Sequence, residues 1–488
     1  MPTLLTPLQT VIYLLVFALV MLFVTTFFGR KIGSKTVEGF LVVDRNVHWT
    51  LGGFSIAASW TWAVALMISV QMAYQQGLAG IFWFTVPNVI AVLVFIWLGP
   101  RIRDLLPKGY SLPEYMHSRF HSRGVTYLYL FVYFYYQVIA ATVQIYAGAQ
   151  LLSAASGISA TTLMPTVLII TLLYAVISGL EASIVTDFLQ LVLILVPGWI
   201  TIFLVTKAGG FHFNLHGVGP GGGLNPFSPS IALTAGVISS IGLLSGSIGD
   251  QVFWQRCLAI RAHEIRRSFL FGALLFATIP IGLSLLGFTA AAPEVGFRLP
   301  HGFDPSLVGF AVVHQLIPAG LATMYMIMIL SGLCSTLDSS LSAASSLYEL
   351  VVTKPWSQDA AQRRPFTILQ GRLSMLVVGM VGLVLGYAVE FIPGFGLKYL
   401  WWFLNTIGAC VVVPTVLSLF WNRLQAKGIL IGSGIGLAVG LPLVSIGSIK
   451  GNDPLLAATY AGIVLVSVMA CLFTAAPATH GGARRDAT

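Results

Sequence analysis

Hydroxyl and carboxyl side chains are concentrated between residues 331 and 346, directly after the apolar stretch 324–330. At 3.6 residues per turn, the oxygen-bearing members of this run fall in or near one narrow stripe of a helix. They are Ser331, Ser335, Asp338, Ser339, Ser342, Ser345 and Ser346. Because oxygens are the ligands of hard cations such as Na⁺, the stripe predicts a cation site.

Close helix packing is the alternative explanation, since serines occur at tight helix interfaces and bond back to their own carbonyls. That alternative accounts for the serines but not for Asp338. A carboxylate in hydrocarbon costs roughly 2.5–3.5 kcal/mol on insertion scales. Asp338 therefore needs a partner.

The composition is that of a multi-pass membrane protein. Of 488 residues, 57% are hydrophobic and 8% charged, and mean hydropathy is +0.89, whereas soluble domains are about 25% charged. The four cysteines lie in or beside apolar segments without paired spacing, so neither a disulfide framework nor a zinc site is indicated. The net charge of +9 fits basic cytoplasmic loops and gives no reason to expect a nucleic-acid partner.

A span of about 20 apolar residues per crossing predicts thirteen transmembrane helices in an all-α protein. We expect them at 8–28, 50–74, 80–99, 125–153, 161–180, 183–206, 231–254, 267–290, 318–348, 368–391, 396–421, 427–447 and 454–474.

Basic residues fall unevenly on the two sides of these helices. Of the 25 Lys and Arg residues, 21 lie on one side, and only Lys207, Arg298, Lys398 and Lys450 on the other. Because positive charge marks the cytoplasmic side, the N-terminus is predicted outside and the C-terminus inside the plasma (inner) membrane.

Two of the predicted helices are poorly suited to being continuous. The second contains the run 52–62 and the seventh the run 239–251, both rich in Gly and Ser. Such residues also permit close packing of unbroken helices. Their occurrence five helices apart instead favours an inverted repeat whose broken helices meet at the middle of the membrane.

Three motifs together resemble the sodium:solute symporter family over roughly residues 8–475. They are the serine-rich run 330–339, the run Gly-Leu-Glu-Ala-Ser-Ile-Val-Thr-Asp-Phe-Leu-Gln at 179–190, and Asp-Gln-Val-Phe-Trp-Gln-Arg at 250–256. The last motif, with Ala-Ser-Trp-Thr-Trp-Ala at 58–63, is most similar to the urea active transporter branch.

The resemblance implies a leucine-transporter-type core, in which five helices are repeated in inverted orientation. Residues 1–488 would form one membrane domain with no attached soluble unit. Its parts are an extra N-terminal helix at 8–28, a first repeat at 50–206, a second repeat at 231–421, and two C-terminal helices at 427–474.

The resemblance also implies a sodium site between the first and eighth core helices. Its ligands would be the carbonyls of Ala58, Thr61 and Gly332 and the hydroxyls of Ser335 and Thr336. Some members have a second sodium site, which here would use Asp187, Asp338 and Ser339 with Ser335. Because Asp338 replaces a serine of those members, the number of ions stays open, and one carboxylate could be protonated.

A small polar solute needs aromatic walls and a few hydrogen-bonding groups. The candidates that face the predicted core are Trp60, Trp62, Gln71, Asn88, Tyr136, Gln137, Gln251, Trp254, Trp401, Trp402 and Asn405. Asp250 could meet the solute, or it could pair with Arg256 as a cytoplasmic gate, which we favour.

We therefore predict Na⁺-coupled uptake of a small polar solute by alternating access, with urea or a similar amide or nitrogen compound as leading solute. The bilayer is the other expected partner, and no obligate protein partner is evident. The alternatives are a proton-coupled carrier using Asp187 and Asp338, and a transporter-like sensor, for which the tail 474–488 is short. We expect no enzyme, because the helices offer no paired histidines.

Overall fold

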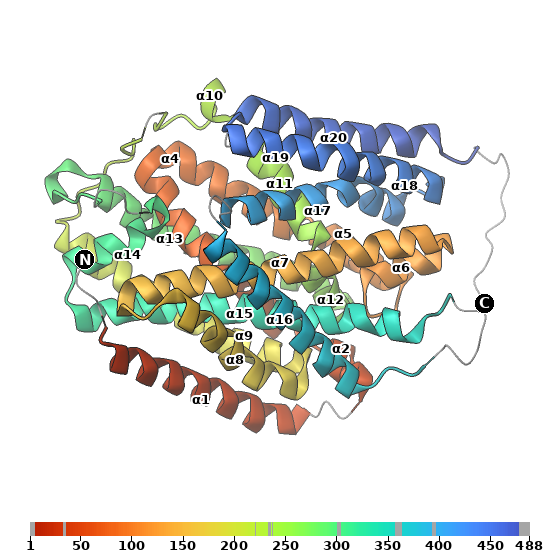
Figure 1. Ribbon diagram of the computed structural model, residues 1–488, viewed down its shortest axis with the longest axis horizontal. Coiled ribbons are helices and arrows are strands. Elements are labelled where there is room, and N and C mark those ends of the chain that lie inside the picture. The colour runs from red at the N-terminus through yellow and green to blue at the C-terminus, as the bar shows by residue number, and fades with distance from the viewer. Residues whose placement is uncertain are drawn as a thin grey trace.

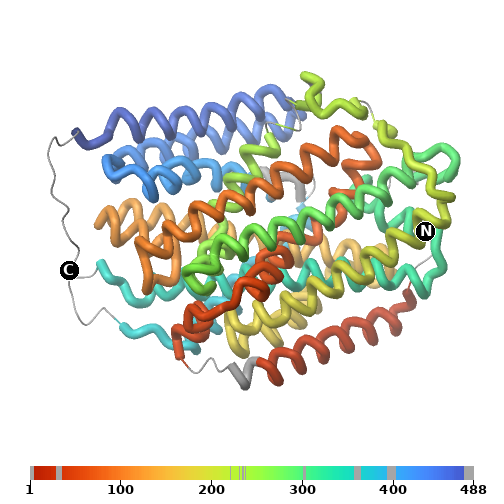
Figure 2. Tube along the Cα trace, turned by 180° about the vertical axis from the view of Figure 1, so that it is seen from behind, coloured from red at the N-terminus to blue at the C-terminus, as the bar shows by residue number. Residues whose placement is uncertain are grey.

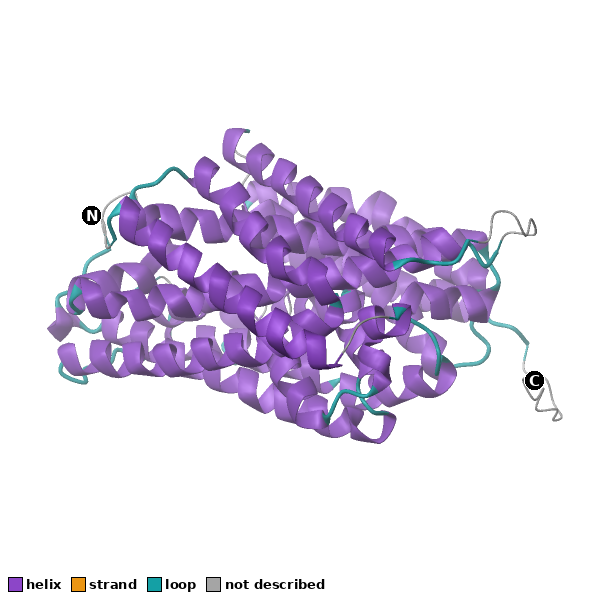
Figure 3. Cartoon of the chain, turned by 90° about the horizontal axis from the view of Figure 1, so that it is seen from below, coloured by secondary structure: helices purple, strands orange, loops and turns teal. Residues whose placement is uncertain are grey.

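A computed structural model describes residues 5–32, 36–219, 221–232, 236, 238–299, 304–356, 364–392 and 397–477. Within these ranges every regular element is a helix, apart from an isolated bridge between Val47 and Ile260. The axes of most long helices are roughly aligned, and the helices form one bundle (Figure 1; Figure 3 shows it from below).

The first part of the bundle contains the helices expected for the first repeat and the segments that flank it. They are α1 (Pro7–Ile32), α2 (Val37–Val42), η1 (Val43–Arg45), α3 (Trp49–Trp60), α4 (Ala63–Leu93), α5 (Phe95–Leu105), α6 (Leu112–Phe120), α7 (Arg123–Ser156), α8 (Ala160–Ser178) and α9 (Leu180–Ala208).

The second part contains the helices expected for the second repeat and for the C-terminal pair. They are α10 (Pro229–Ile231), α11 (Ile238–Gly249), α12 (Gln251–Ala259), η3 (Ala262–Glu264), α13 (Ile265–Ala291), η4 (Pro293–Val295), η5 (Pro305–Leu307), α14 (Val308–Leu316), α15 (Ala319–Thr353), α16 (Ile368–Phe391), α17 (Leu397–Phe420), α18 (Ala426–Ile435), the π-helical turn η7 (Gly436–Gly440), α19 (Leu441–Lys450) and α20 (Asp453–Phe473).

The arrangement supports an odd number of crossings. Helix α1 begins at one end of the bundle and α20 ends at the other (Figures 1 and 2). In the described part of the chain, 11 helical segments are long and apolar enough to cross a membrane. The predicted total of thirteen exceeds this because the crossings at 50–74 and 231–254 are each divided into shorter helices, α3 with the start of α4, and α11 with α12.

Both predicted helix breaks are confirmed. Helix α3 ends at Trp60, and Trp62 is extended with φ −64° and ψ 148° before α4 begins. The second break is at Asp250, with φ −96° and ψ 120°, whose carboxylate accepts a hydrogen bond from the Val252 N–H and so caps α12. Side chains therefore supply the bonds that the interrupted helices lack.

The predicted connection between the helices at 50–74 and 80–99 is present as an interruption at Gly77 inside α4, where φ is +64° and ψ −150°. The loop after α9 packs on this turn through main-chain bonds, Leu78 N–H to the Leu215 carbonyl at 2.8 Å and Val218 N–H to the Tyr74 carbonyl at 2.9 Å. A Cβ at position 77 would lie 2.2 Å from the Leu215 oxygen. Only glycine fits here, because both its φ and its surroundings exclude a side chain.

Basic side chains at the end of the bundle where α20 ends bind the terminal carbonyls of neighbouring helices. Arg101 Nε donates to the Leu419 carbonyl at 2.8 Å and Arg119 Nη2 to the Trp421 carbonyl at 2.9 Å, at the end of α17. Arg103 Nη1 binds the Leu258 carbonyl at 2.7 Å near the end of α12. These cations satisfy carbonyls that a helix end leaves unpaired, and they face the negative end of its dipole.

We predict that Gly77→Ala lowers stability by roughly 1–3 kcal/mol, because the backbone there is left-handed and the loop carbonyl blocks the methyl group. The measurement is the apparent Tm of the purified protein. Gly320→Ala is the matched control, since a Cβ at that helical position meets nothing within 4 Å. A Gly77→Ala variant as stable as Gly320→Ala would contradict the prediction.

Candidate functional site

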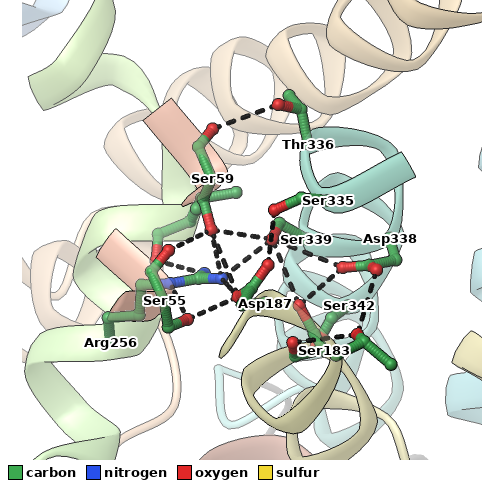
Figure 4. A network of polar contacts seen from close by, with 12 residues as sticks. Ser55, Ser59, Ser183, Asp187, Arg256, Ser335, Thr336, Asp338, Ser339 and Ser342 are labelled. Atoms are coloured by element: carbon green, nitrogen blue, oxygen red, sulfur yellow. Dashed lines mark hydrogen bonds and ion pairs between the residues drawn. The ribbon is translucent and has the colours of Figure 1, made fainter. Parts of the chain in front are cut away.

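A fully buried ion pair joins α12 to α9. Arg256 Nη2 lies 3.0 Å from Asp187 Oδ2, and both residues have a relative accessibility of 0%. The guanidinium also donates through Nε to Ser55 Oγ at 2.9 Å, and through Nη2 to Ser339 Oγ at 2.8 Å and to Ser59 Oγ. One side chain thus binds α3, α9 and α15 at once (Figure 4).

The two buried aspartates have different partners. Asp187 accepts hydrogen bonds from the hydroxyls of Ser55 and Ser335 in addition to the guanidinium. Asp338 accepts from Tyr174 and Ser183, each at 2.7 Å. Asp338 is therefore held by neutral hydroxyls, whereas Asp187 faces a cation.

The break between α3 and α4 faces α15. The Ala63 N–H donates to Gln144 Oε1 of α7 at 3.2 Å instead of to the Ser59 carbonyl, which accepts from Thr336 Oγ1 at 3.3 Å. A Cβ at Gly332 would lie 2.9 Å from the Thr61 carbonyl oxygen, so the two helices touch there.

The residues predicted for the first Na⁺ site are arranged around this break. Gly332 and Thr336 approach Thr61 and Ser59, and the Ala58 carbonyl ends the helix by accepting from the Thr61 N–H at 3.0 Å. Ser335 lies one turn from Gly332 and donates to Asp187 (Figure 4). Carbonyl and hydroxyl oxygens from two helices are thus brought together, and this donor set fits Na⁺.

The residues predicted for a second Na⁺ site do not form a common cage. Asp187 and Ser339 bind Arg256, while Asp338 turns to Tyr174 and Ser183. Because the guanidinium already pairs with Asp187, the charge of that carboxylate is not free to attract a further cation. The sequence motif did not reveal this because Arg256 is 69 residues from Asp187.

The predicted pairing of Asp250 with Arg256 is wrong. Asp250 Oδ1 accepts from Gln137 Nε2 at 3.0 Å and from the Val252 N–H at 2.9 Å, because it caps α12. Arg256, almost two turns further along the helix, reaches Asp187 instead.

Five of the predicted solute-binding residues line one small cavity, with a volume of about 20 Å³. The five are Trp60, Trp62, Asn88, Tyr136 and Asn405. The rest of the lining is Val64, Ala65, Ile68, Phe84, Leu243 and Gly246. The Trp60 Nε1–H is buried without a hydrogen-bond partner among the described residues, so it is a free donor at this cavity.

Four other predicted residues have structural partners elsewhere. Gln251 donates to the Tyr110 carbonyl and to Ser346 Oγ, and Trp254 donates to the Ile248 carbonyl. Gln137 binds Asp250, and Gln71 binds Gln75. These four do not line the cavity. The side chains of Trp401 and Trp402 lie outside the described residues.

Sequence reasoning missed the groups that complete the site. Ser55 and Ser59 bind Arg256, Ser183 binds Asp338, and Gln144 holds the helix break open. Each is a polar side chain in an apolar helix, which was the available signal.

The sodium:solute symporter family model matches residues 40–436 of the chain. The urea-proton symporter DUR3 of Oryza sativa subsp. japonica is 24% identical over 463 residues, which cover 87% of this chain and 63% of that protein. The urea active transporter of Saccharomyces cerevisiae is 21% identical over 453 residues, covering 86% and 60%. The chain thus spans less than two thirds of the length of these two relatives.

A second group of similar proteins has sodium in the description. The sodium/glucose cotransporter of Vibrio parahaemolyticus is 22% identical over 435 residues, covering 83% of this chain and 78% of that protein. The solved structure of a Na⁺-coupled sialic acid symporter, in a substrate-bound outward-open state, has a TM-score of 0.73 at 20% identity, over 96% of this chain and 99% of that one. This likeness confirms the predicted leucine-transporter-type fold.

We predict that Asp187→Asn is strongly destabilising, because it leaves a buried guanidinium without its counter-charge, a change that costs about 3–5 kcal/mol. The double variant Asp187→Asn with Arg256→Gln removes both charges and should be the more stable of the two. Apparent Tm measured in detergent compares them with the unchanged protein. An Asp187→Asn protein with unchanged Tm would show that the pair is not formed.

Proposed function

Because the chain belongs to the sodium:solute symporter family, we propose that it carries a small polar solute across the membrane together with a coupling cation. It is a multi-pass membrane protein of a family of transporters and not of enzymes. One observation carries the proposal: the segment 59–62, which contains the helix break at 61–62, is shared by two sites. Trp60 and Trp62 line the cavity, while the Ser59 and Thr61 carbonyls meet α15.

A shared segment couples the two sites physically. A cation bound by the carbonyls of Ala58 and Thr61 fixes the backbone on which Trp60 and Trp62 are carried. A solute held by these indoles favours the same backbone in return, because coupling between two sites is reciprocal. The proposed Na⁺ ligands are the backbone carbonyls of Ala58, Thr61 and Gly332. The hydroxyls of Ser335 and Thr336 complete the set.

Na⁺ is our proposal for the coupling ion, and the proton is the alternative. The oxygen donors around the break support Na⁺. The rice relative is described as a urea-proton symporter, whereas the Vibrio relative is a sodium cotransporter. Ion replacement in a transport assay separates the two.

Urea is our leading solute. A cavity of about 20 Å³ exceeds the space that one water molecule needs but is small for a sugar. Its walls are aromatic, and the free Trp60 N–H can donate to a carbonyl oxygen. A methyl group at Gly246 would lie 3.3 Å from both Asn405 Oδ1 and Tyr136 Oη, so two oxygens flank an open space that suits the N–H groups of an amide.

Alternating access then requires the ion pair to separate. Arg256 joins α12 to α3, α9 and α15, and therefore holds these helices together. We propose that its release opens the cytoplasmic side, with the N-terminus outside and the C-terminus inside the plasma membrane. Arg256 keeps its predicted role as a gate residue, with Asp187 in place of Asp250.

We predict that Ser335→Ala or Thr336→Ala raises the Na⁺ concentration for half-maximal uptake of labelled urea into proteoliposomes. A lost ligand worth about 1.4 kcal/mol corresponds to a roughly tenfold increase. Ser340→Ala is the control, because among the described residues this buried hydroxyl bonds only to the Thr336 carbonyl of its own helix.

Uptake by the unchanged protein should stop when choline replaces Na⁺. Uptake that follows a pH gradient and ignores Na⁺ would select proton coupling. Equal half-saturation in all three serine and threonine variants would show that the ion binds elsewhere.

We predict that Gly246→Ala raises KM for urea roughly fivefold, the equivalent of one hydrogen bond of about 1 kcal/mol, because the methyl group fills the space between Asn405 and Tyr136. Gly242→Ala is the matched control, because its Cβ would lie 3.5 Å from the Asn405 side chain, which is an ordinary van der Waals contact. Initial rates of uptake measure both. If the two variants behave alike, the solute does not bind between these oxygens.

A further inference from the structure

We infer that the guanidinium of Arg256 takes the place of a second coupling ion, so that the chain binds Na⁺ only at the break between α3 and α4. The inference rests on the proposed function of ion-coupled carriage. It concerns the number of ions that the protein takes up, which neither the family nor the relatives determine.

The first argument is coordination. Four oxygens from three helices surround the guanidinium: Ser55 Oγ, Ser59 Oγ, Ser339 Oγ and Asp187 Oδ2. Three hydroxyls and a carboxylate are the donor set of a hard monovalent cation. Here a cation already occupies it, tethered to α12.

The second argument is that the guanidinium already uses these hydroxyls as acceptors, while their protons are directed to other oxygens. Ser59 Oγ donates to the Ser55 carbonyl at 2.7 Å and accepts from Arg256. Ser55 Oγ donates to Asp187 and accepts from Arg256 Nε. A hydroxyl has one proton and two lone pairs, so both oxygens are engaged in donating and accepting.

The third argument is charge. Asp187 and Arg256 are wholly buried and cancel each other, so the cluster offers an external cation no net attraction. Asp338 makes no direct bond to the guanidinium among the described residues, because its oxygens accept from the hydroxyls of Tyr174 and Ser183 at 2.7 Å each. Figure 4 shows the two carboxylates facing different partners.

Removing the guanidinium should therefore turn the cluster into an ion site. In Arg256→Gln, Asp187 and the three hydroxyls remain, now without a cation. We expect this variant to bind about one more Na⁺ per chain than the unchanged protein, and its thermal stability to become strongly dependent on Na⁺. Arg256→Lys keeps a tethered charge and should bind the same number as the unchanged protein.

The experiment is equilibrium binding of radioactive Na⁺ to the full-length protein in detergent, which needs no knowledge of the solute. An equal count in the unchanged protein and Arg256→Gln overturns the inference. So does a count of two in the unchanged protein.

A further pair of variants keeps the test valid if Arg256→Gln fails to fold. With Ser335→Ala and Thr336→Ala combined, bound Na⁺ should fall to background, because the inference leaves no other site. Persistent binding of one Na⁺ would locate an ion outside the break and overturn it. Ser340→Ala is the control for handling and folding.

Failure of the proposed function gives a different result. If the carrier is proton-coupled, the unchanged protein binds no Na⁺, yet Arg256→Gln still gains one, and the inference that the guanidinium occupies an ion site stands. If uptake is Na⁺-dependent but Arg256→Gln gains none, the proposed function stands and the inference fails.

Discussion

The buried pair of Arg256 and Asp187 is the interaction on which the arrangement of the core depends. Desolvating two charges is costly, and the attraction between them offsets that cost only when further hydrogen bonds complete the geometry. Those bonds come from Ser55, Ser59 and Ser339, which belong to α3 and α15. The penalty for breaking the pair therefore acts on four helices together.

This constraint lies next to the segment that carries the proposed transport function. Ser59 binds the guanidinium through its hydroxyl and Thr336 through its carbonyl. Trp60 and Trp62, which come directly after Ser59 in the sequence, line the cavity. A single stretch of backbone thus connects the ion pair, the oxygens of α15 and the solute cavity, which gives a short physical route for coupling.

Features governed by local sequence were predictable. Gly and Ser in the runs 52–62 and 239–251 indicated the two helix breaks, and hydrophobic stretches indicated the helices. The type of fold followed from the resemblance to the family. Five cavity residues were also found, because aromatic and amide side chains near a break are unusual in an apolar chain.

Features governed by the reach of side chains between distant helices were not predictable. Asp250 is the acidic residue nearest to Arg256 in sequence, yet capping turns it toward Val252 while the helix carries Arg256 to Asp187. Gln251 was expected at the solute for its place beside a break, but it binds Tyr110 and Ser346. The positive φ of Gly77 depends on a loop that docks through its main chain, which leaves no pattern of side chains to read.

The arginines that bind helix ends have a consequence for biogenesis. During insertion, a Lys and an Arg are equally effective in retaining a loop in the cytosol, since only charge is sensed. Afterwards Arg101 and Arg119 hold the carbonyls of Leu419 and Trp421 through a planar fork that lysine lacks. With the proposed orientation, the same residues act first as topogenic signals and then as hydrogen-bond donors to the finished helix, so a change of Arg to Lys would separate the two roles.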